Sequence, residues 1–458
     1  MTAAESRASA HTETVTAALA RRAAALRPET LPAEIRLLAR QCLLDWFAVT
    51  LASAREELTR ILVAEAEEQG GRPVASLIGR ALRTSTQQAA LVNGAASHAL
   101  DYDDVNMTMG GHPTVPVMPA ILALAEARGA SGTDLITAFV AGYETACRVG
   151  ALVAPGHYAK GFHATATAGS FGAAAASANL LRLDAETTAT ALGIAGTQAA
   201  GLKAMFGTMC KPLHAGKAAQ NGLIAATLAA RRFSSRADVL DCAQGFAATQ
   251  SADFRAEAAL ADPAGGYHLR ANLFKYHAAC YLTHAPIECA RTLRRRHGIA
   301  PAQIREVVLR LDSGAAKVCH ILAPRTGLEA KFSLRLTTAM ALAGCDTADL
   351  STYSEANATD PALVALRDKV TVAFQPAWPH TLAEMAVTLE DGRRFETRHD
   401  SGIPAADLAA QGERLDAKFM SLAEPVLGRA RARDVADAVA AMDTLPKVSA
   451  LTRLCVPA

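Results

Sequence analysis

Acid–base side chains are concentrated between residues 93 and 119, where the sequence reads NGAASHALDYDDVNMTMGGHPTVPVMP. Glycines and prolines interrupt this segment, so it cannot be one regular helix, and we expect a polar loop between two apolar helices. Imidazoles and carboxylates on a loop held by a rigid scaffold can transfer protons and bind ions, so this loop is a candidate pocket floor. The alternative is an ordinary solvated connection with an Asp-capped helix end. The side chains concerned are His98, Asp101, Asp103, Asp104 and His112.

Three further polar islands interrupt the apolar background of the chain. They read KGFHAT from residue 160, CKPLHAGK from residue 210 and HAACYLTH from residue 277. Each stands at the expected start of a helix, where backbone N–H groups can hold a carboxylate. A single histidine is more often structural than catalytic, but together the islands supply the anion-holding and proton-transfer groups needed for acid–base chemistry beside a carboxylate.

Several common catalytic motifs are missing from the sequence. It contains no G-x-G-x-x-G after a strand, no G-x-x-x-x-G-K-[ST], no H-E-x-x-H and no G-x-S-x-G. A nucleotide-binding, zinc-hydrolase or serine-hydrolase mechanism therefore loses support, and no metal-ligand set is assigned.

The composition favours a globular protein of two domains. The 458 residues are 51% hydrophobic and 20% charged, and a formal charge of +2 gives no general attraction to nucleic acid. Nine cysteines without a C-x-x-C pair indicate a reducing compartment. The N-terminal segment has no apolar signal region, and no window of about 18 uninterrupted apolar residues exists. We expect a cytoplasmic protein without a nucleic-acid or membrane partner.

Hydrophobic periodicity changes from helical to mixed along the chain. An amphipathic helix is expected from Leu31 to Ala52, and shorter strand-like runs follow residue 265, including a hairpin at Asp391-Gly392. We predict a mainly α protein with an α+β second domain: an all-α domain over 10–265, completed by 405–458, and an α+β domain over 266–404. Further helices are expected at 85–100, 117–128, 133–153, 165–181, 185–200, 216–231, 281–296 and 332–344, and strands at 305–311, 369–374, 384–390 and 394–397.

Six motifs give the chain a resemblance to a known family. The runs NGAASHALDYDD, GHPT, AGYETACRVG, KGFHATATAGSFGAAAAS, KPLHAGKAAQNG and the TH pair at 283–284 resemble the MmgE/PrpD family over residues 10–440. Its members include 2-methylcitrate dehydratase, cis-aconitate decarboxylase and iminodisuccinate epimerase. The resemblance implies a large helical domain built from both chain ends, an inserted α+β domain, a homodimer, and an interdomain active site that uses no cofactor.

The resemblance also implies a pocket that contains Asp101, His112, His163, Lys211 and His284. The chain departs from the decarboxylase-like members at Val105, where they have threonine, at Leu336, where a tyrosine is expected, and by one extra residue before His112. These departures count against authentic cis-aconitate decarboxylation. Tyr143 is a candidate to replace the missing phenol as proton donor, and a buried structural tyrosine is the alternative.

The leading hypothesis is a lyase, a dehydratase or decarboxylase, acting on a small di- or tricarboxylate. Lys211, with its pKa lowered by an apolar wall or a nearby cation, is a candidate base. Alternatively Lys211, Lys160, His163 and His214 bind substrate carboxylates, while His112 or His163 moves the proton and Asp101 orients a histidine. An epimerase of an iminodisuccinate-like dicarboxylate and a non-catalytic carboxylate-binding homologue are the competing hypotheses.

Overall fold

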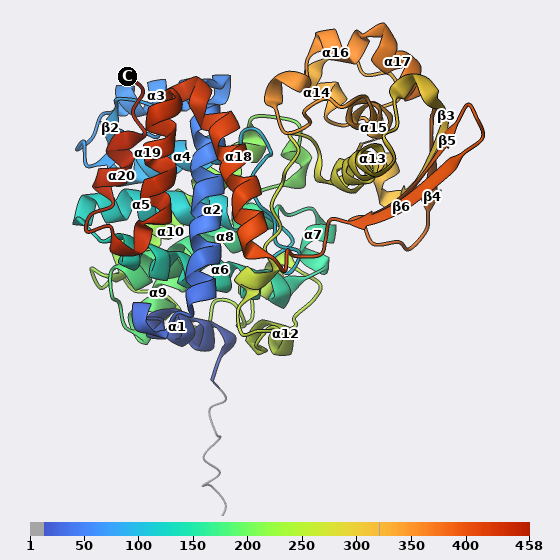
Figure 1. The fold of residues 1–458 in the computed structure, drawn as a ribbon. Coiled ribbons are helices and arrows are strands. Elements are labelled where there is room, and N and C mark those ends of the chain that lie inside the picture. The colour runs from blue at the N-terminus through green and yellow to red at the C-terminus, as the bar shows by residue number, and fades with distance from the viewer. Residues whose placement is uncertain (1–12, 320) are drawn as a thin grey trace, which may run out of the picture.

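A computed structural model describes residues 13–319 and 321–458 and shows a large helical domain beside a smaller domain (Figure 1). Residues 10–12 of the predicted helical domain, and residues 1–12 of the N-terminal segment assessed for a leader, lie outside the described residues. The chain is mainly helical, with one mixed sheet in the small domain, which confirms the predicted fold class.

The helical domain is built from both parts of the chain that flank the small domain. The C-terminal helix α18 packs along α2, so the end of the chain returns to its beginning (Figure 1). A two-residue ladder, β1 (Ala75–Ser76) with β2 (Arg83–Thr84), was not predicted. The helices are α1 (Val15–Ala25), α2 (Ala33–Ala52), α3 (Glu57–Gln69), α4 (Thr86–His98), α5 (Thr114–Arg128), α6 (Gly132–Val153), α7 (Gly156–Lys160), α8 (Ala164–Leu180), α9 (Ala185–Gly196), α10 (Cys210–Ala229), α11 (Phe246–Gln250), α12 (Ala256–Leu260), α18 (Leu408–Leu427), α19 (Arg429–Ala440) and α20 (Ser449–Leu454).

Small residues bring α4 and α10 close together. A Cβ atom added at Gly94 would lie 2.7 Å from the Cα of Gly216, and one added at Gly216 would lie 2.2 Å from the carbonyl oxygen of Leu91. Only glycine fits at this crossing, because any side chain would separate the helices. The crossing places the end of α4, with His98, near the start of α10, with Lys211.

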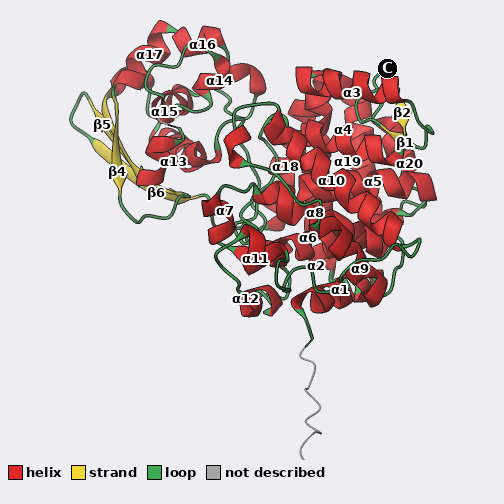
Figure 2. Ribbon diagram, turned by 180° about the vertical axis from the view of Figure 1, so that it is seen from behind, coloured by secondary structure: helices red, strands yellow, loops and turns green. Residues whose placement is uncertain are grey.

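The small domain packs helices on one mixed sheet. Strand order is β4 (Val370–Gln375), β3 (Ile304–Asp312), β5 (Leu382–Leu389) and β6 (Arg394–Asp400), with only the β3–β4 pair parallel. Helices α13 (His284–His297) and α15 (Leu334–Ala343) lie between the sheet and the helical domain (Figure 2). The domain also contains α14 (Gly327–Ala330), α16 (Glu355–Thr359) and α17 (Pro361–Asp368).

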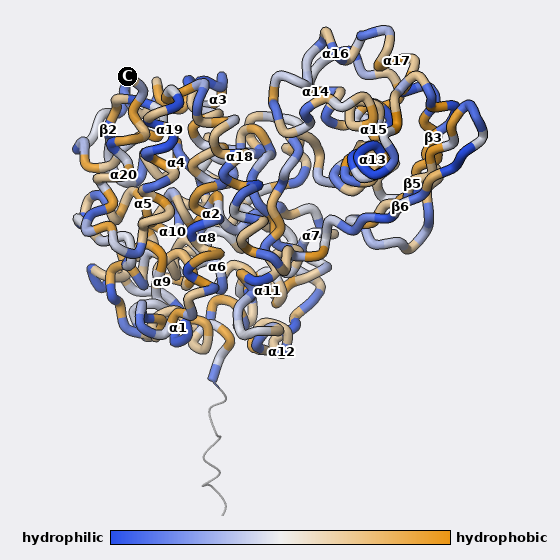
Figure 3. The backbone as a smooth tube through the Cα atoms, in the orientation of Figure 1, coloured by the Kyte–Doolittle hydropathy of each residue, from blue (hydrophilic) through white to orange (hydrophobic). Residues whose placement is uncertain are grey.

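The small domain has a hydrophobic core of its own. It includes Val307 and Leu309 of β3, Val387 of β5 and Leu293 of α13. Figure 3 shows β3 and β5 with many hydrophobic residues and α13 as largely hydrophilic. Arg294, Arg295 and Arg296 near the end of α13 are exposed. This basic run is a solvated helix face.

Most of the elements that local patterns predicted lie within a few residues of their expected bounds, while short helices such as α7, α11 and α12 were not predicted. The Asp391-Gly392 pair does connect β5 to β6, with Gly392 at a φ of 86°. The main difference is α10, which begins at Cys210 instead of 216, so Lys211 lies inside its first turn, where Pro212 is tolerated. The predicted domain boundaries at 265/266 and 404/405 fall in the two connections, between α12 and α13 and between β6 and α18.

Two helical segments are long and apolar enough to match a membrane span by length and composition alone. They cover Ala33–Arg55 and Gly132–Val153, and 78% and 94% of their windows are buried inside the protein. Core helices of a large helical domain give the same signal.

We predict that Gly216→Ala destabilises the protein by about 1–3 kcal/mol, since the new methyl group overpacks the α4–α10 crossing. Gly412→Ala in α18 is the matched control, because its Cβ would meet only the side-chain nitrogen of Gln41, at 3.2 Å. This control should be neutral or stabilise by up to about 1 kcal/mol through helix propensity. Denaturant unfolding of both variants measures the difference, and equal stabilities would contradict the close approach.

Candidate active site

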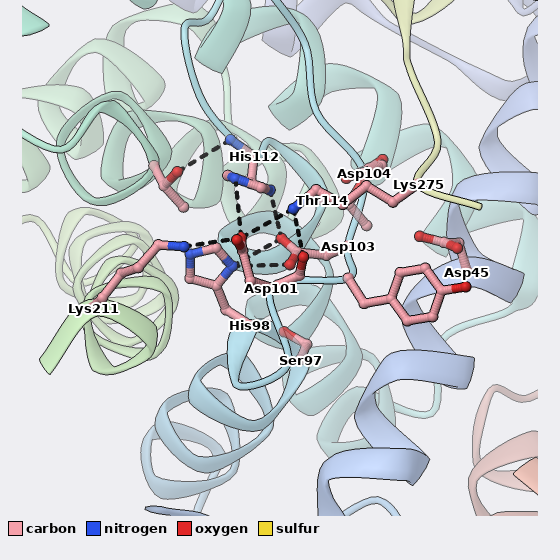
Figure 4. A network of polar contacts seen from close by, with 12 residues as sticks. Asp45, Ser97, His98, Asp101, Asp103, Asp104, His112, Thr114, Lys211 and Lys275 are labelled. Carbon is pink, nitrogen blue, oxygen red and sulfur yellow. Dashed lines mark hydrogen bonds and ion pairs between the residues drawn. The ribbon is translucent and has the colours of Figure 1, made fainter. Parts of the chain in front are cut away.

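The loop between α4 and α5 is held in a non-helical shape by contacts with distant segments. Val105 pairs with Leu273 through two backbone hydrogen bonds of 2.9 Å, which tie the loop to the connection between the domains. Asp101 has a φ of 51°, a left-handed conformation that is uncommon for a residue with a side chain. Its carboxylate points into the centre of a polar network (Figure 4).

Two ammonium groups converge on Asp101. Its Oδ1 atom lies 2.9 Å from Nζ of Lys211 and 3.0 Å from Nζ of Lys275, which also donates to the Asp101 carbonyl oxygen. Lys211 and Lys275 approach the carboxylate from opposite sides (Figure 4). Burial raises the pKa of Asp101, but the two lysines outweigh it and hold that pKa well below its ordinary value.

The same contact decides the protonation of Lys211. Burial lowers its pKa, but Asp101 outweighs burial and the pKa is raised. The expectation that Lys211 is tuned to act as a base is therefore wrong. It is a fixed cation, and Asp101 contacts the lysines while the nearest atom of His112 is 3.9 Å away.

Asp103, and not Asp101, orients histidines. Its carboxylate lies 2.9 Å from Nδ1 of His98 and 2.8 Å from Nδ1 of His112. Burial raises the pKa of Asp103, but the two imidazoles outweigh it and hold the pKa well below its ordinary value. The carboxylate is thus ionised. It hydrogen-bonds to Nδ1 of His98, whereas Nδ1 of His112 lies within ion-pair distance without hydrogen-bond geometry.

His98 is a neutral histidine with one free nitrogen. Burial lowers its pKa to about 4 despite the neighbouring Asp103. With Nδ1–H donated to Asp103, Nε2 carries a lone pair, and it has no hydrogen-bond partner among the residues that the structure describes. This is the arrangement of a proton acceptor.

His163 and His214 stand behind this ring. Their Nδ1 atoms are 3.1 Å apart, and the His163 ring stacks on His98 with centroids 5.8 Å apart. Burial lowers the pKa of both His163 and His214. His163 caps the start of α8, and its backbone N–H donates to the carbonyl oxygen of Gly201.

A buried lysine of α18 joins the loop to the rest of the helical domain. Nζ of Lys418 lies 2.5 Å from Asp45 of α2 and donates to the carbonyl oxygens of Tyr102 and Lys275, at 2.8 and 2.9 Å. Burial lowers the pKa of Lys418, and Asp45 opposes this effect. Lys418 therefore fixes the backbone at Tyr102, directly after Asp101, and at Lys275.

A cavity of about 570 Å³ opens between the domains beside this network. The helical domain contributes His98, Asp101 and Lys211, and the small-domain side contributes Cys280 and Lys331. Burial lowers the pKa of Lys331. Glu56, Glu57 and Glu329 also line the cavity.

Some residues predicted from the sequence lie elsewhere. His284 lines a different cavity, of about 370 Å³, with Glu288 and Arg414. Lys160 is exposed and donates to the carbonyl oxygen of Thr249. The buried hydroxyl of Tyr143 donates to Asn272 at 2.7 Å and accepts from Asn106 at 3.1 Å, so it joins the site loop to the interdomain connection.

Sequence reasoning missed Lys275, Lys331 and Cys280, and gave His98 no role. Lys275 contacts Asp101 across 174 residues of sequence, and no local pattern marks it. Cys280 lies in the polar island HAACYLTH that begins at residue 277. The residue predicted for the site from this island is His284, and not the thiol. His98 stands three residues before Asp101 in the same motif, so its position in that motif was the sequence feature that could have identified it.

Four side chains of the network have ligand atoms close enough for a metal ion. The atoms of His98, Asp101, Asp103 and His112 lie within 4.8 Å of one another. However, Asp101 already contacts two ammonium groups and Asp103 already contacts two imidazoles. A divalent cation would be repelled by Lys211 and Lys275 at close range, so the donor set fits an ion-pair network better than a metal centre.

Two family models match this chain. A family model described as the MmgE/PrpD N-terminal domain matches residues 17–259, and the MmgE/PrpD C-terminal domain matches residues 277–444. The chain belongs to the MmgE/PrpD family. The C-terminal match extends beyond β6 into α18 and α19, so in this family member it includes the return to the helical domain.

The MmgE/PrpD chain is similar to cis-aconitate decarboxylases. One from Aspergillus terreus is 26% identical over 472 residues, covering 96% of this chain and 95% of that protein. One from Homo sapiens is 29% identical over 396 residues, covering 81% and 80%. A cis-aconitate decarboxylase-like protein of Aspergillus oryzae is 33% identical over 240 residues, half of each chain.

The first prediction for the site concerns Asp104, a buried neighbour of the network in this MmgE/PrpD protein. Burial raises its pKa from 3.8 to about 7, although Thr114 donates to it at 2.6 Å. An acid whose pKa is raised in the folded state costs nothing below about pH 4, where it is protonated in both states. As the pH rises from 4 to 7, the free energy of unfolding falls by roughly 4 kcal/mol, because the unfolded state releases the proton first. Asp104→Asn removes this loss, so the variant should gain stability over the wild type between pH 5 and pH 8.

Denaturant midpoints of both proteins across this pH range give the measurement. The difference between variant and wild type cancels the contributions of other acids. Parallel curves would show that Asp104 is ionised in the folded protein at low pH.

The second prediction concerns Tyr143. Tyr143→Phe removes the hydroxyl contacts with Asn106 and Asn272, and we expect a stability loss of about 1–3 kcal/mol. Its kcat should fall by far less than the roughly 10²-fold that loss of a general acid causes. Unfolding and steady-state kinetics on the same preparation test both parts, and a folded, stable variant with a collapsed kcat would identify Tyr143 as a proton donor.

Proposed function

We propose that this protein is a lyase that decarboxylates or dehydrates a small di- or tricarboxylate without a cofactor. The observation that carries the proposal is the interdomain cavity, in which fixed ammonium groups lie beside a carboxylate-oriented neutral imidazole. The cis-aconitate decarboxylase names of the relatives support a tricarboxylate as the first substrate to test.

The ammonium groups of the cavity support a substrate with more than one carboxylate. Lys211 and Lys275 share the single negative charge of Asp101, which leaves one positive charge uncompensated. Lys331 adds a second ammonium on the small-domain wall. Glu56, Glu57 and Glu329 line the same cavity, so the support comes from the positions of the ammonium groups and not from the net charge: Lys211 and Lys331, on the two walls, can each bind one substrate carboxylate.

The same groups suit the chemistry of both reactions. Each builds negative charge on a carbon beside a carboxylate, and fixed cations stabilise that charge without reorganising. Dehydration also needs a base, and Nε2 of His98, with Nδ1 fixed by Asp103, has the geometry of one. Decarboxylation needs no base, but its product carbanion must be protonated.

The sequence departures lie outside the cavity wall. Val105 is pinned against Leu273, and Leu336 is fully buried in the hydrophobic core. Neither Val105, in place of the threonine, nor Leu336, in place of the tyrosine, is among the residues that line the cavity. This supports a proposal at the level of the reaction class, with the substrate to be found among related carboxylates.

Proton NMR in D₂O with a panel of citrate-like, aconitate-like and aspartate-derived carboxylates tests the function. We expect an alkene or decarboxylated product from one tricarboxylate, with unchanged turnover after treatment with a chelator. Deuterium that enters a carbon beside a carboxylate of otherwise unchanged substrate would instead indicate an epimerase. Binding without any conversion would indicate a non-catalytic homologue.

Lys211→Met tests the role of the cavity cations. Removing this ammonium should lower kcat/KM by about 10²-fold or more, as expected when a charge-stabilising donor is lost. Lys160→Met is the matched control, since Lys160 contacts only the exterior carbonyl of Thr249 and should leave turnover unchanged. Equal effects of the two substitutions would refute the proposed site.

A further inference from the structure

Cys280 contributes a thiol to the wall of the active-site cavity. It lies on the small-domain side, five residues after Lys275, and is only 8% exposed. Its backbone N–H donates to the carbonyl oxygen of Lys331 at 3.1 Å, which joins two segments that line the cavity. His98, Asp101 and Lys211 line the helical-domain side of the same space.

A second cysteine stands behind Cys280. Cys319 is fully buried, and its thiol donates to the carbonyl oxygen of Ala315 at 3.7 Å. A hydrogen bond from Cys319 is the largest effect that lowers the pKa of the Cys280 thiol. The backbone N–H of Leu282 is a second donor to Cys280.

We propose that Cys280 is the general acid of this enzyme, a catalytic residue that protonates the carbanion left by loss of CO₂. This inference rests on the proposed lyase function. In the step, the substrate has a C=C bond next to the carbon that carries the departing carboxylate. The C–C bond to that carboxylate breaks and CO₂ leaves, the released electron pair forms a new alkene, and the pair of the original C=C bond moves to its far carbon. The carbon that becomes nucleophilic takes the proton of the Cys280 S–H bond, and solvent returns a proton to the thiolate.

The surroundings of Cys280 suit this role. The hydrogen bond from Cys319 lowers the pKa of the Cys280 thiol, against the opposing effect of burial. Lys275 stabilises the thiolate, while the Asp101 carboxylate opposes it. The thiolate formed by proton donation therefore has two hydrogen-bond donors and a cation to stabilise it.

Other groups facing the cavity are poorer donors. His98 is neutral, with its only N–H directed at Asp103. Lys211 is held as a cation by Asp101, which makes its proton harder to release. Lys331 carries a pKa lowered by burial, and it is the one competing acid that the test must exclude.

Kinetics of four variants test the proposal on the substrate found with the wild type. Cys280→Ala and Cys280→Ser should lower kcat about 10²-fold or more with little change in KM, because serine is too weak an acid to replace the thiol. Cys345→Ala, a half-buried thiol away from the cavity, is the control. Lys331→Met should raise KM more than it lowers kcat; the reverse pattern, with Cys280→Ala active, would assign the acid to Lys331 and overturn the proposal.

The pH profile separates a chemical from a structural effect. Activity that needs the protonated thiol falls as pH rises through the pKa of Cys280. Cys319→Ala removes a donor to the thiolate and should move this basic limb to higher pH, while Cys319→Ser, which restores a donor, should move it back. A limb that stays in place in all Cys319 variants would overturn the proposal.

Iodoacetamide labelling, read by peptide mass spectrometry, measures the same pKa without turnover. The labelling rate of Cys280 should follow the thiolate, shift in Cys319→Ala as the kinetic limb does, and decrease with bound carboxylate. Exposed Cys210 and buried Cys289 are internal controls for access. A wild type that converts no carboxylate refutes the lyase function, whereas an active wild type with an active Cys280→Ala variant refutes this inference alone.

Discussion

The carboxylate of Asp101 is the contact on which the active site depends. It is reached by Lys211 from α10 and by Lys275 from the connection between the domains, so one side chain links three separate parts of the chain. Removing it would leave two ammonium groups facing each other in a poorly hydrated place, where like charges repel strongly. Its left-handed backbone is stable because these contacts, together with the Val105–Leu273 pairing, determine the local shape.

Proton transfer and charge binding are separated by two neighbouring aspartates. Asp101 balances ammonium groups, while Asp103, two residues later, orients the imidazoles of His98 and His112. The intervening Tyr102 points elsewhere, with its backbone carbonyl held by Lys418. A short loop therefore carries both the carboxylate that pairs with the lysines and the carboxylate that fixes the tautomer of His98.

Local and motif-level features could be predicted from the sequence, and long-range partners could not. The β5–β6 hairpin follows from Asp391-Gly392, because turn geometry depends on adjacent residues. The motif around Asp101 predicted a polar loop, which the structure places beside the interdomain cavity. The spacing of its aspartates does not reveal which of them contacts lysines and which contacts histidines. The contact of Lys275 with Asp101 depends on how the connection between the domains crosses the loop, which no local pattern determines. The one-turn helix Tyr281–Thr283 places Cys280 in the active-site cavity and His284 in another, a difference that neither residue type nor spacing signals.

The junction at Lys418 has a consequence for synthesis on the ribosome. Asp45 emerges 373 residues before the ammonium that compensates it, and the small domain is translated in between. The small domain has its own core and can fold as a unit while the helical domain still lacks α18. The domain that begins first is thus completed last, and the cavity acquires its final geometry only when the C-terminal helices leave the exit tunnel. Nascent chains that stall before α18 carry a formed small domain and an immature active site.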